Sequence, residues 1–336
     1  MDIGKAQMPM APDPSAASAS SAALPLQPPP QPPPQPPPQQ RPHPHPHPQS
    51  PSPSMAARLG AKAAVFVPDG AEAELAISRT TDMCIAAHQD DIEFMAYNAI
   101  VDCYRQRSRW FTACVVTDGA GSPRAGLYTD YTNEEMKQVR AREQNIAAAV
   151  GEYSAMAQFG YPSSVVKDAK TDEVVLSIAK LLDLARPEVV YTHNLADKHD
   201  THVAVALRVL SAIRSLPATV RPKKLYAMEC WRGLDWVTDA EKTVFDVSSH
   251  PNLATSLLGI FDSQIMGGKR YDLAMLGRRA ANATMYASHG VDELTLAVYA
   301  LDMSELIDSD EDPTQYIAGY IARFAQDVAA RIAKSS

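Results

Sequence analysis

Short apolar runs alternate with longer stretches of helical periodicity through most of the chain, and this alternation constrains the fold most strongly. The runs that could form strands are 83–87, 111–117, 156–160, 189–192, 225–230 and 244–247. Stretches with helical spacing lie between them, at 92–106, 133–150, 171–184 and 202–215, and three more follow at 253–266, 271–287 and 315–333. Such alternation is typical of a parallel sheet with helices on both faces. We therefore predict an α/β fold with a mostly parallel sheet.

The N-terminal segment has a different composition. The first 54 residues hold 19 of the 27 prolines and contain no Phe, Trp or Tyr. A segment of this kind cannot bury enough apolar surface to offset its loss of entropy on ordering. We therefore predict a disordered Pro/Gln/His-rich tail over residues 1–56, with polyproline II character, and one domain over residues 57–336. The histidines of residues 43–47 could bind a metal weakly, but we assign this biased repeat no catalytic role.

Charge and cysteine content limit the partners and the compartment. The formal net charge of −8 falls on the part after the tail, because the four charges of the tail cancel. An acidic domain without a basic stripe argues against nucleic acid as a partner. No apolar run approaches the roughly 20 residues that span a bilayer, and the four cysteines show no paired spacing. We expect a cytoplasmic protein without a membrane span, and a homo-oligomer is compatible with these features.

The first polar cluster follows the apolar run 83–87. It reads His88-Gln89-Asp90-Asp91 and stands directly before a helical pattern. The cluster would lie at the carboxyl end of a strand, where ligands bind in open α/β sheets. Histidine and aspartate together are a ligand set that suits zinc. On this stretch alone an alternative stays open, in which Asp90 or Asp91 caps the next helix and His88 is a buried histidine.

The second polar cluster follows the run 189–192 in the same way. Residues 193–202 contain three histidines and two aspartates, and the chain then continues with helical periodicity. His199 and His202 are three positions apart, so on a helical turn both rings share a face. One ring could bind a metal while the other reaches a substrate. So dense a cluster at one strand end is hard to ascribe to packing.

Other polar residues are weaker candidates for the site. The loop at 117–123 is rich in small residues, which let backbone approach a ligand, but it lacks the fingerprint of dinucleotide binding. Arg124, which follows it, is a candidate substrate contact. Arg140 is another, and its alternative is an ion pair with Glu143 on the helix surface. His289 either closes the pocket or is a plain histidine at a helix end.

The order of these motifs resembles that of the PIG-L/LmbE-like zinc N-deacetylases. Residues 87–91 resemble the A-H-P-D-D signature of this family, and Thr117-Asp118-Gly119, Arg140-x-x-Glu143 and His199-x-x-His202 follow in the family's order. The resemblance covers roughly residues 80–215, and the C-terminal third only loosely. It implies a Rossmann-like α/β fold. It also implies a hydrolase that removes the N-acetyl group from an N-acetylglucosamine-containing conjugate, a small-molecule partner.

The resemblance also implies roles for individual residues. His88, Asp91 and His202 are expected to bind Zn²⁺. Asp90 is expected to act as general base. His199 is expected to stabilise the oxyanion or to protonate the leaving amine.

Two residues depart from the family pattern. Gln89 replaces the usual proline, a change that loosens the turn without touching a ligand. Thr201 stands where the family often has an aspartate that orients the catalytic histidine, and Asp200 lies one residue earlier, about 100° around a helix. Asp197 or Asp200 could still reach His199 across the turn, and Asp197 is also a candidate substrate contact.

Two other classes of function remain open. One is a non-catalytic sugar-binding descendant of the same fold. The other is a metal-dependent nucleotidyl or phosphoryl transferase, in which Asp90 and Asp91 would hold Mg²⁺. The chain has no P-loop motif, and its histidines favour zinc over magnesium.

Overall fold

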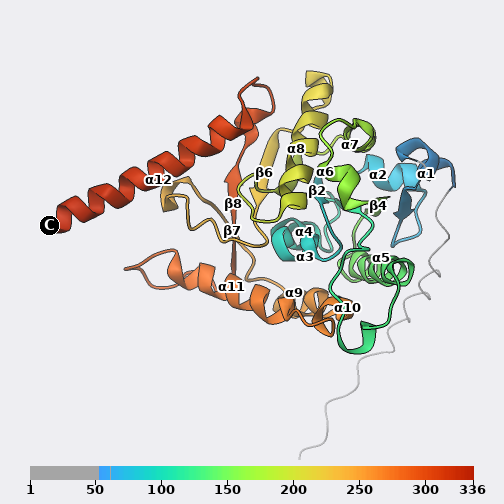
Figure 1. Cartoon of the computed structure of the whole chain (residues 1–336), viewed down its shortest axis with the longest axis horizontal. Coiled ribbons are helices and arrows are strands. Elements are labelled where there is room, and N and C mark those ends of the chain that lie inside the picture. The colour runs from blue at the N-terminus through green and yellow to red at the C-terminus, as the bar shows by residue number, and fades with distance from the viewer. Residues whose placement is uncertain (1–52, 61) are drawn as a thin grey trace, which may run out of the picture. The chain divides into compact units, whose positions relative to one another are not determined.

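The computed structural model describes residues 53–60 and 62–336, which form a sheet with helices on both faces (Figure 1). The strand order is β1-β4-β3-β2-β5-β6-β8-β7. The strands are β1 (Ala64–Phe66), β2 (Asp82–Ala86), β3 (Phe111–Thr117), β4 (Ala155–Tyr161), β5 (Val189–His193), β6 (Lys224–Met228), β7 (Thr243–Asp246) and β8 (Ala297–Asp302). Strands β2 to β6 pair in parallel, whereas β1 and β8 run antiparallel to their neighbours. The predicted α/β class with a mostly parallel sheet is confirmed.

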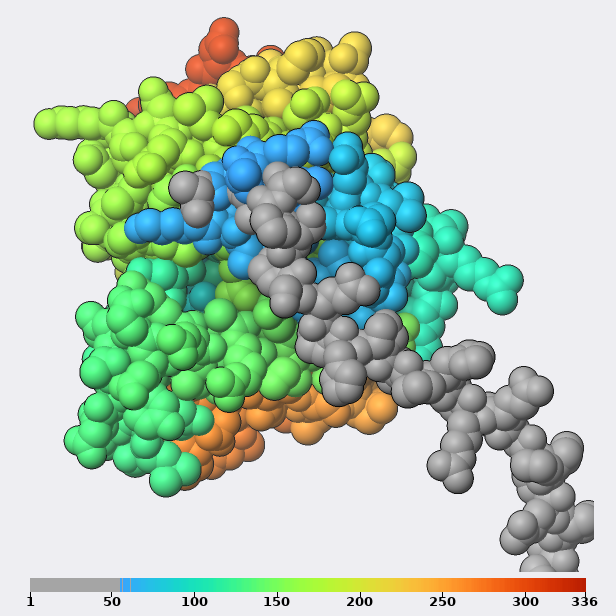
Figure 2. Space-filling model, turned by 90° about the vertical axis from the view of Figure 1, so that its right-hand side faces the viewer, coloured from blue at the N-terminus to red at the C-terminus, as the bar shows by residue number. Residues whose placement is uncertain are grey.

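The helices divide between the two faces because side chains along each strand alternate in direction. In β2, Met83 and Ile85 join one buried cluster, and Cys84 and Ala86 join the other. The first cluster is covered by α1 (Pro53–Leu59), α2 (Ala73–Ser78), α6 (Ser163–Lys167), α7 (Glu173–Ala185) and α8 (Asp200–Ser215); the second by α3 (Asp91–Met95), α4 (Tyr97–Cys103), α5 (Asn133–Val150), α9 (Pro251–Gly259) and α11 (Tyr271–Met285). Figure 2 shows the β1 side, where α1 and α2 (blue) lie above α5 (green).

The strand order reverses between β2 and β5, and this reversal places the site. From β2 the chain adds β3 and β4 on one side, and then returns to add β5 and β6 on the other. At such a reversal the connections leave in opposite directions and open a crevice at the carboxyl ends of the two strands. Both polar clusters of the sequence follow these two strands.

Several elements differ from the expectation. The predicted helix at 92–106 is two helices, α3 and α4, which are separated at Ala96. All five residues of α3 are buried, so this short helix has no solvent-exposed face. The predicted helix at 253–266 is likewise two, α9 and α10 (Asp262–Ile265). Strand β8 was not predicted, although it lies inside the sheet between β6 and β7.

The two ends of the described chain are helical. Of the predicted tail, residues 1–52 lie outside the described residues. Residues 53–56 begin α1, because Met55 and Leu59, four positions apart, are both buried in the core. At the other end, α12 (Pro313–Ser335) buries only Tyr316 and Ile317 along its length. Within the described ranges, none of the helices is long and apolar enough to cross a membrane.

Candidate metal and catalytic site

The turn after β2 holds Asp90 in an unusual backbone conformation, with φ 90° and ψ −32°. Residues other than glycine rarely adopt these backbone angles, which cost about 1–3 kcal/mol. Two residues of α5 hold the turn in place: the Asp90 N–H donates to Gln144 Oε1 at 3.1 Å, and Arg140 donates to the Gln89 carbonyl. Asp90 occupies the N-cap position of α3, but its side chain makes no capping hydrogen bond. The alternative of a plain helix cap is therefore wrong for Asp90.

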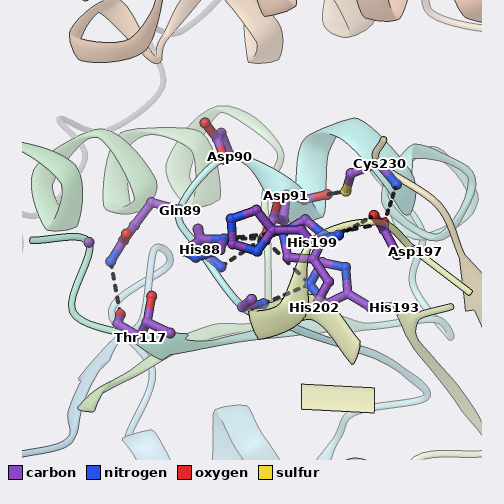
Figure 3. Close-up of polar contacts among 12 residues, drawn as sticks. His88, Gln89, Asp90, Asp91, Thr117, His193, Asp197, His199, His202 and Cys230 are labelled. Atoms are coloured by element: carbon purple, nitrogen blue, oxygen red, sulfur yellow. Dashed lines mark hydrogen bonds and ion pairs between the residues drawn. The ribbon is translucent and has the colours of Figure 1, made fainter. Parts of the chain in front are cut away.

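The three predicted metal ligands converge in the structure (Figure 3). His88 Nδ1 lies 3.1 Å from Asp91 Oδ2 and 3.2 Å from His202 Nε2. His202 Nε2 lies 3.3 Å from Asp91 Oδ2. Zinc bonds to nitrogen and oxygen are about 2.0–2.2 Å long, so tetrahedral zinc ligands lie roughly 3.4 Å apart. Two imidazole nitrogens and one carboxylate oxygen at these separations fit a single zinc ion.

Asp197 orients the His202 ring from behind. The carboxylate of Asp197 accepts from His202 Nδ1 at 3.2 Å and from the Cys230 N–H at 3.2 Å. This arrangement leaves His202 Nε2 facing the other two ligands, as carboxylates commonly do for metal-binding histidines. The side chain of Asp197 is 0% exposed. Asp197 is therefore not the substrate contact that we expected, because the His202 ring separates it from the pocket.

The pKa shifts of His202 and Asp197 are consistent with a hydrogen bond between an imidazole and a carboxylate. Burial lowers the pKa of His202, but Asp91 and Asp197 outweigh it and raise the pKa to about 10. Burial raises the pKa of Asp197, but the hydrogen bond and the charge of His202 bring it below its usual range. The carboxylates of Asp91 and Asp197 thus favour positive charge at the His202 ring.

His193 is a site residue that the sequence did not single out. Its ring stacks on His202, with centroids 3.9 Å apart, and its Nε2 accepts from the Ala87 N–H at 2.8 Å. Burial lowers the pKa of His193 to about 4, so the ring is neutral and can accept this bond. His193 is one of the three histidines of the second polar cluster. Its position as the last residue of a buried strand was the only sequence feature that could have indicated a role in the site. His193, Asp197, His202 and Cys230 also form a possible ligand group, but Asp197 and His193 already accept hydrogen bonds there.

The two adjacent aspartates have opposite electrostatic environments. Burial raises the pKa of Asp90 well above its usual range, and Arg140, 3.4 Å away, opposes this shift. Burial also raises the pKa of Asp91, but His202 and His193 outweigh it and hold the pKa well below the usual range. Asp90 lines the same pocket but stands apart from the converging atoms (Figure 3). Neighbouring carboxyls with separated pKa values can serve as a ligand and as a proton acceptor.

His199 lies at the N-cap position of α8 and lines the pocket. Its ring stacks on His202 at 4.6 Å and meets the edge of His88 at 5.0 Å. Burial, with the charges of His202 and His88, lowers the pKa of His199, so the ring is neutral near pH 7. Its Nδ1 has no hydrogen-bond partner among the described residues. The bond that Asp197 or Asp200 could have made to this ring is absent from that set, and Asp197 accepts only from the backbone N–H of His199.

The side chains enclose a cavity of about 460 Å³ above these residues. Arg140 lines it, so for Arg140 the pocket interpretation holds. The alternative ion pair with Glu143 is not formed, because Glu143 accepts from Ser263 instead.

Two predicted substrate contacts lie elsewhere. Arg124 donates to the Ala120 carbonyl and to Asn133 Oδ1. These two bonds hold its guanidinium against its own loop. His289 is exposed in the turn beyond α11, whereas the part of α11 that lines the cavity runs from Tyr271 to Arg278. These two expectations were wrong, because each residue's own loop carries it away from the crevice.

The fold and the site together define an α/β protein with a candidate metal site at the reversal point of its sheet. Residues 83–213 match the family described as PIG-L: GlcNAc-PI de-N-acetylase. The chain therefore contains a PIG-L family domain, and the resemblance inferred from its motifs is confirmed. The matched segment contains every residue of the converging ligand set and both candidate catalytic residues. No curated protein matches this chain.

Solved structures with a similar fold carry more than one chemistry. A conserved protein from Thermus thermophilus has 16% identity and a TM-score of 0.53 over 67% of this chain and 94% of its own. The N,N'-diacetylchitobiose deacetylase from Pyrococcus horikoshii has 13% identity and a TM-score of 0.53 over 68% and 85%. The 4-carboxy-2-hydroxymuconate hydratase GalB from Pseudomonas putida has 16% identity and a TM-score of 0.51 over 67% and 96%. Function must therefore be argued from the site.

Proposed function

We propose that this chain is a zinc-dependent N-deacetylase that acts on a conjugate of N-acetylglucosamine. The observation that carries the proposal is the triangle of ligand atoms from His88, Asp91 and His202, with sides of 3.1, 3.2 and 3.3 Å. The separate position of Asp90 in the same cavity supports it further. In the reaction, water cleaves the amide to give acetate and a free amine on the sugar.

The residues around the triangle divide the chemistry between them. When bound, zinc would supply a Lewis acid that polarises the amide carbonyl and activates water. Asp90 accepts the proton of the attacking water, and Arg140, 3.4 Å away, opposes the effect of burial, which favours the protonated form of Asp90. The neutral His199 ring donates an N–H to the oxygen that becomes negative. The proton that Asp90 takes from water is then transferred to the leaving nitrogen, which becomes the free amine.

The test uses the purified full chain. Zinc content is measured first, and release of acetate and of free amine is then followed with a panel of N-acetylglucosamine glycosides. We expect about one zinc per chain and equal amounts of the two products. A protein that binds zinc but releases no amine from any member of the panel would refute the deacetylase proposal. A protein that takes up magnesium in preference to zinc would favour the transferase.

A non-catalytic sugar-binding protein is the second candidate. The observation in its favour is that no carboxylate of the described residues contacts the His199 ring, with Thr201 in the place of the usual aspartate. In this case the panel would bind, as measured by calorimetry, with no acetate released. Turnover of any glycoside would exclude this candidate.

A further inference from the structure

Helix α12 is attached to the rest of the domain through its first half alone. Its buried residues, Tyr316 and Ile317, lie in the first turns. Farther along, Arg323 pairs with Glu241 in the connection between β6 and β7. After Arg323, no hydrogen bond or ion pair joins α12 to another element of the described part of the chain, because the remaining polar contacts lie within the helix. The last three turns or so of α12 therefore extend away from the sheet, as Figure 1 shows.

An apolar stripe runs along this projecting part of α12. It continues from the buried Ile317 at intervals of three or four positions, so its residues share one face of the helix. The stripe consists of Ile321, Phe324, Val328 and Ile332. Ile321, Val328 and Ile332 are 48%, 40% and 62% exposed, respectively. We call these four residues the α12 stripe.

The spacing of the α12 stripe is that of a helix face that packs against a partner. A surface helix normally turns its apolar face to a core and its polar face to water. Here the apolar face continues from the core into solvent. A helical end without tertiary packing is only marginally stable in water, and contiguous exposed apolar surface commonly marks a protein contact. A partner that covers the stripe would stabilise the projecting turns.

Charges beside the α12 stripe favour a second copy of α12 as this partner. Asp327 and Arg331 lie on one flank of the stripe and form an ion pair at 2.8 Å, whereas the other flank consists of Ala322, Ala325 and Ala329. A two-fold axis perpendicular to the helix would bring each flank against the same flank of the partner. Asp327 and Arg331 are each two positions from Ala329. An axis beside Ala329 therefore places each Asp327 level with the partner's Arg331.

We propose that the α12 stripe is the interface of a homodimer in which two copies of α12 pair in antiparallel orientation. With the axis beside Ala329, residues 322–336 of the two copies overlap over about 20 Å. Two helices in contact over this length bury less than the roughly 1,200 Å² of a stable complex. We therefore expect a dimer that dissociates at micromolar concentrations. The residues that line the cavity come from other elements, so each protomer keeps its own site.

The first experiment measures self-association of the full chain by sedimentation velocity over a concentration series. The test variant is Val328→Glu, which places a carboxylate in the stripe. The control is Ala330→Glu, which makes the same change in charge at an exposed position on the opposite side of the same helix. We expect the mass of the wild type to rise toward that of two chains with concentration. Val328→Glu should raise the dissociation constant at least about tenfold, because a carboxylate in an apolar contact must lose water. The control should associate like the wild type, with equal helix content by circular dichroism in all three proteins.

The second experiment tests the antiparallel orientation through the charged flank. Asp327→Arg gives this flank two positive charges, and Arg331→Asp gives it two negative charges. Each variant alone should dissociate about tenfold more readily, because like charges then face each other across the axis. A mixture of the two variants should form heterodimers with close to wild-type affinity. In a parallel pair the charged flank would meet the alanine flank, so these changes would have little effect.

Four results would overturn the proposal. The first is a chain that stays monomeric at every concentration. The second is equal weakening by Val328→Glu and Ala330→Glu, which would show an effect of net charge alone. The third is a dimer that is insensitive to the changes at Asp327 and Arg331. The fourth is a monomer that co-sediments with vesicles of phosphatidylcholine and phosphatidylserine and is released by Val328→Glu, which would assign the stripe to a lipid surface.

Discussion

The two strand ends that form the site hold their side chains by different means. After β2, Asp90 has a φ of 90° and depends on Gln144 and Arg140, both far along the chain on α5. After β5, His202 lies in the regular first turns of α8 and is oriented by Asp197, five positions before it. The proposed base thus depends on long-range contacts, whereas this proposed ligand depends mainly on a local one.

The difference has a chemical consequence. A ligand needs only one nitrogen in the right direction, and a helix with one carboxylate behind it can provide that. Asp90 and Asp91 are adjacent and must point to different places, which a regular helix or strand start does not allow. The positive φ at Asp90 separates their carboxylates, and α5 stabilises it. We therefore expect substitutions of His202 or Asp197 to affect metal binding, and substitutions that disturb Asp90 to affect rate and stability.

The largest effect is expected for His202→Ala. The variant keeps only two of the three ligand atoms, because it lacks the imidazole nitrogen that lies 3.3 Å from Asp91 Oδ2. We expect zinc to be absent after dialysis, as measured by elemental analysis, and activity to be lost with it. Full zinc occupancy in the folded variant would contradict the ligand assignment.

Asp90→Asn should separate rate from metal binding. The side chain keeps its size but loses the ability to accept a proton, so we expect kcat to fall about 10²–10⁴-fold, as for loss of a general base. Zinc content should equal that of the wild type. Near-normal turnover would remove Asp90 from this role. Asp183→Asn, at an exposed aspartate of α7, is the matched control.

Asp197→Asn tests the local support of His202. The amide can replace the carboxylate in shape but stabilises the ring less, so zinc affinity should fall about 10–100-fold. A competition assay with a chromogenic chelator measures this. An unchanged affinity would mean that α8 alone orients the ring and that the carboxylate behind it is dispensable.

Gln144→Leu tests the long-range support of Asp90. Leucine leaves the Asp90 N–H unpaired and removes one of the two side-chain donors to Glu93 Oε1. Buried groups that lose a partner cost about 1–3 kcal/mol each, so we expect the free energy of unfolding to fall by about 2–4 kcal/mol. Chemical denaturation measures the change. A stability close to that of the wild type would show that the turn does not depend on Gln144.

The smallest effect concerns pH, through Glu229 on the β6 side of the site. Burial raises the pKa of Glu229 to about 7, so the folded chain holds a proton that the unfolded chain releases near its ordinary pKa of about 4.3. Its contribution is therefore greatest at low pH and is lost as pH rises through about 7. The free energy of unfolding should fall in the wild type as pH rises from about 5 to 7.5. We expect this fall to be about 1–2 kcal/mol smaller in Glu229→Gln, which has no proton to release at this position. Chemical denaturation at a series of pH values measures this. The same dependence of the free energy of unfolding on pH in both proteins would contradict the assignment.

The sequence was most informative where structure depends on near neighbours. The bounds of β3 and α5 were predicted as they occur. In the structure α5 begins at a capping box formed by Thr132 and Glu135, which is a contact between near neighbours. The break at Ala96 and strand β8 were not predicted. In both places a short apolar stretch is compatible with more than one element, and packing against the rest of the sheet decides between them.

The sequence by itself determined the alternation of strands and helices from β2 to β6 and the two clusters that meet at the carboxyl ends of β2 and β5. Hydrophobic periodicity and strand-end motifs carry this information, because both are local. Only the tertiary structure decided which polar side chains face the cavity: Asp197 and His193 lie behind His202, while Arg124 and His289 lie outside. The direction of a side chain in a turn depends on backbone angles that distant elements stabilise, as α5 does for Asp90.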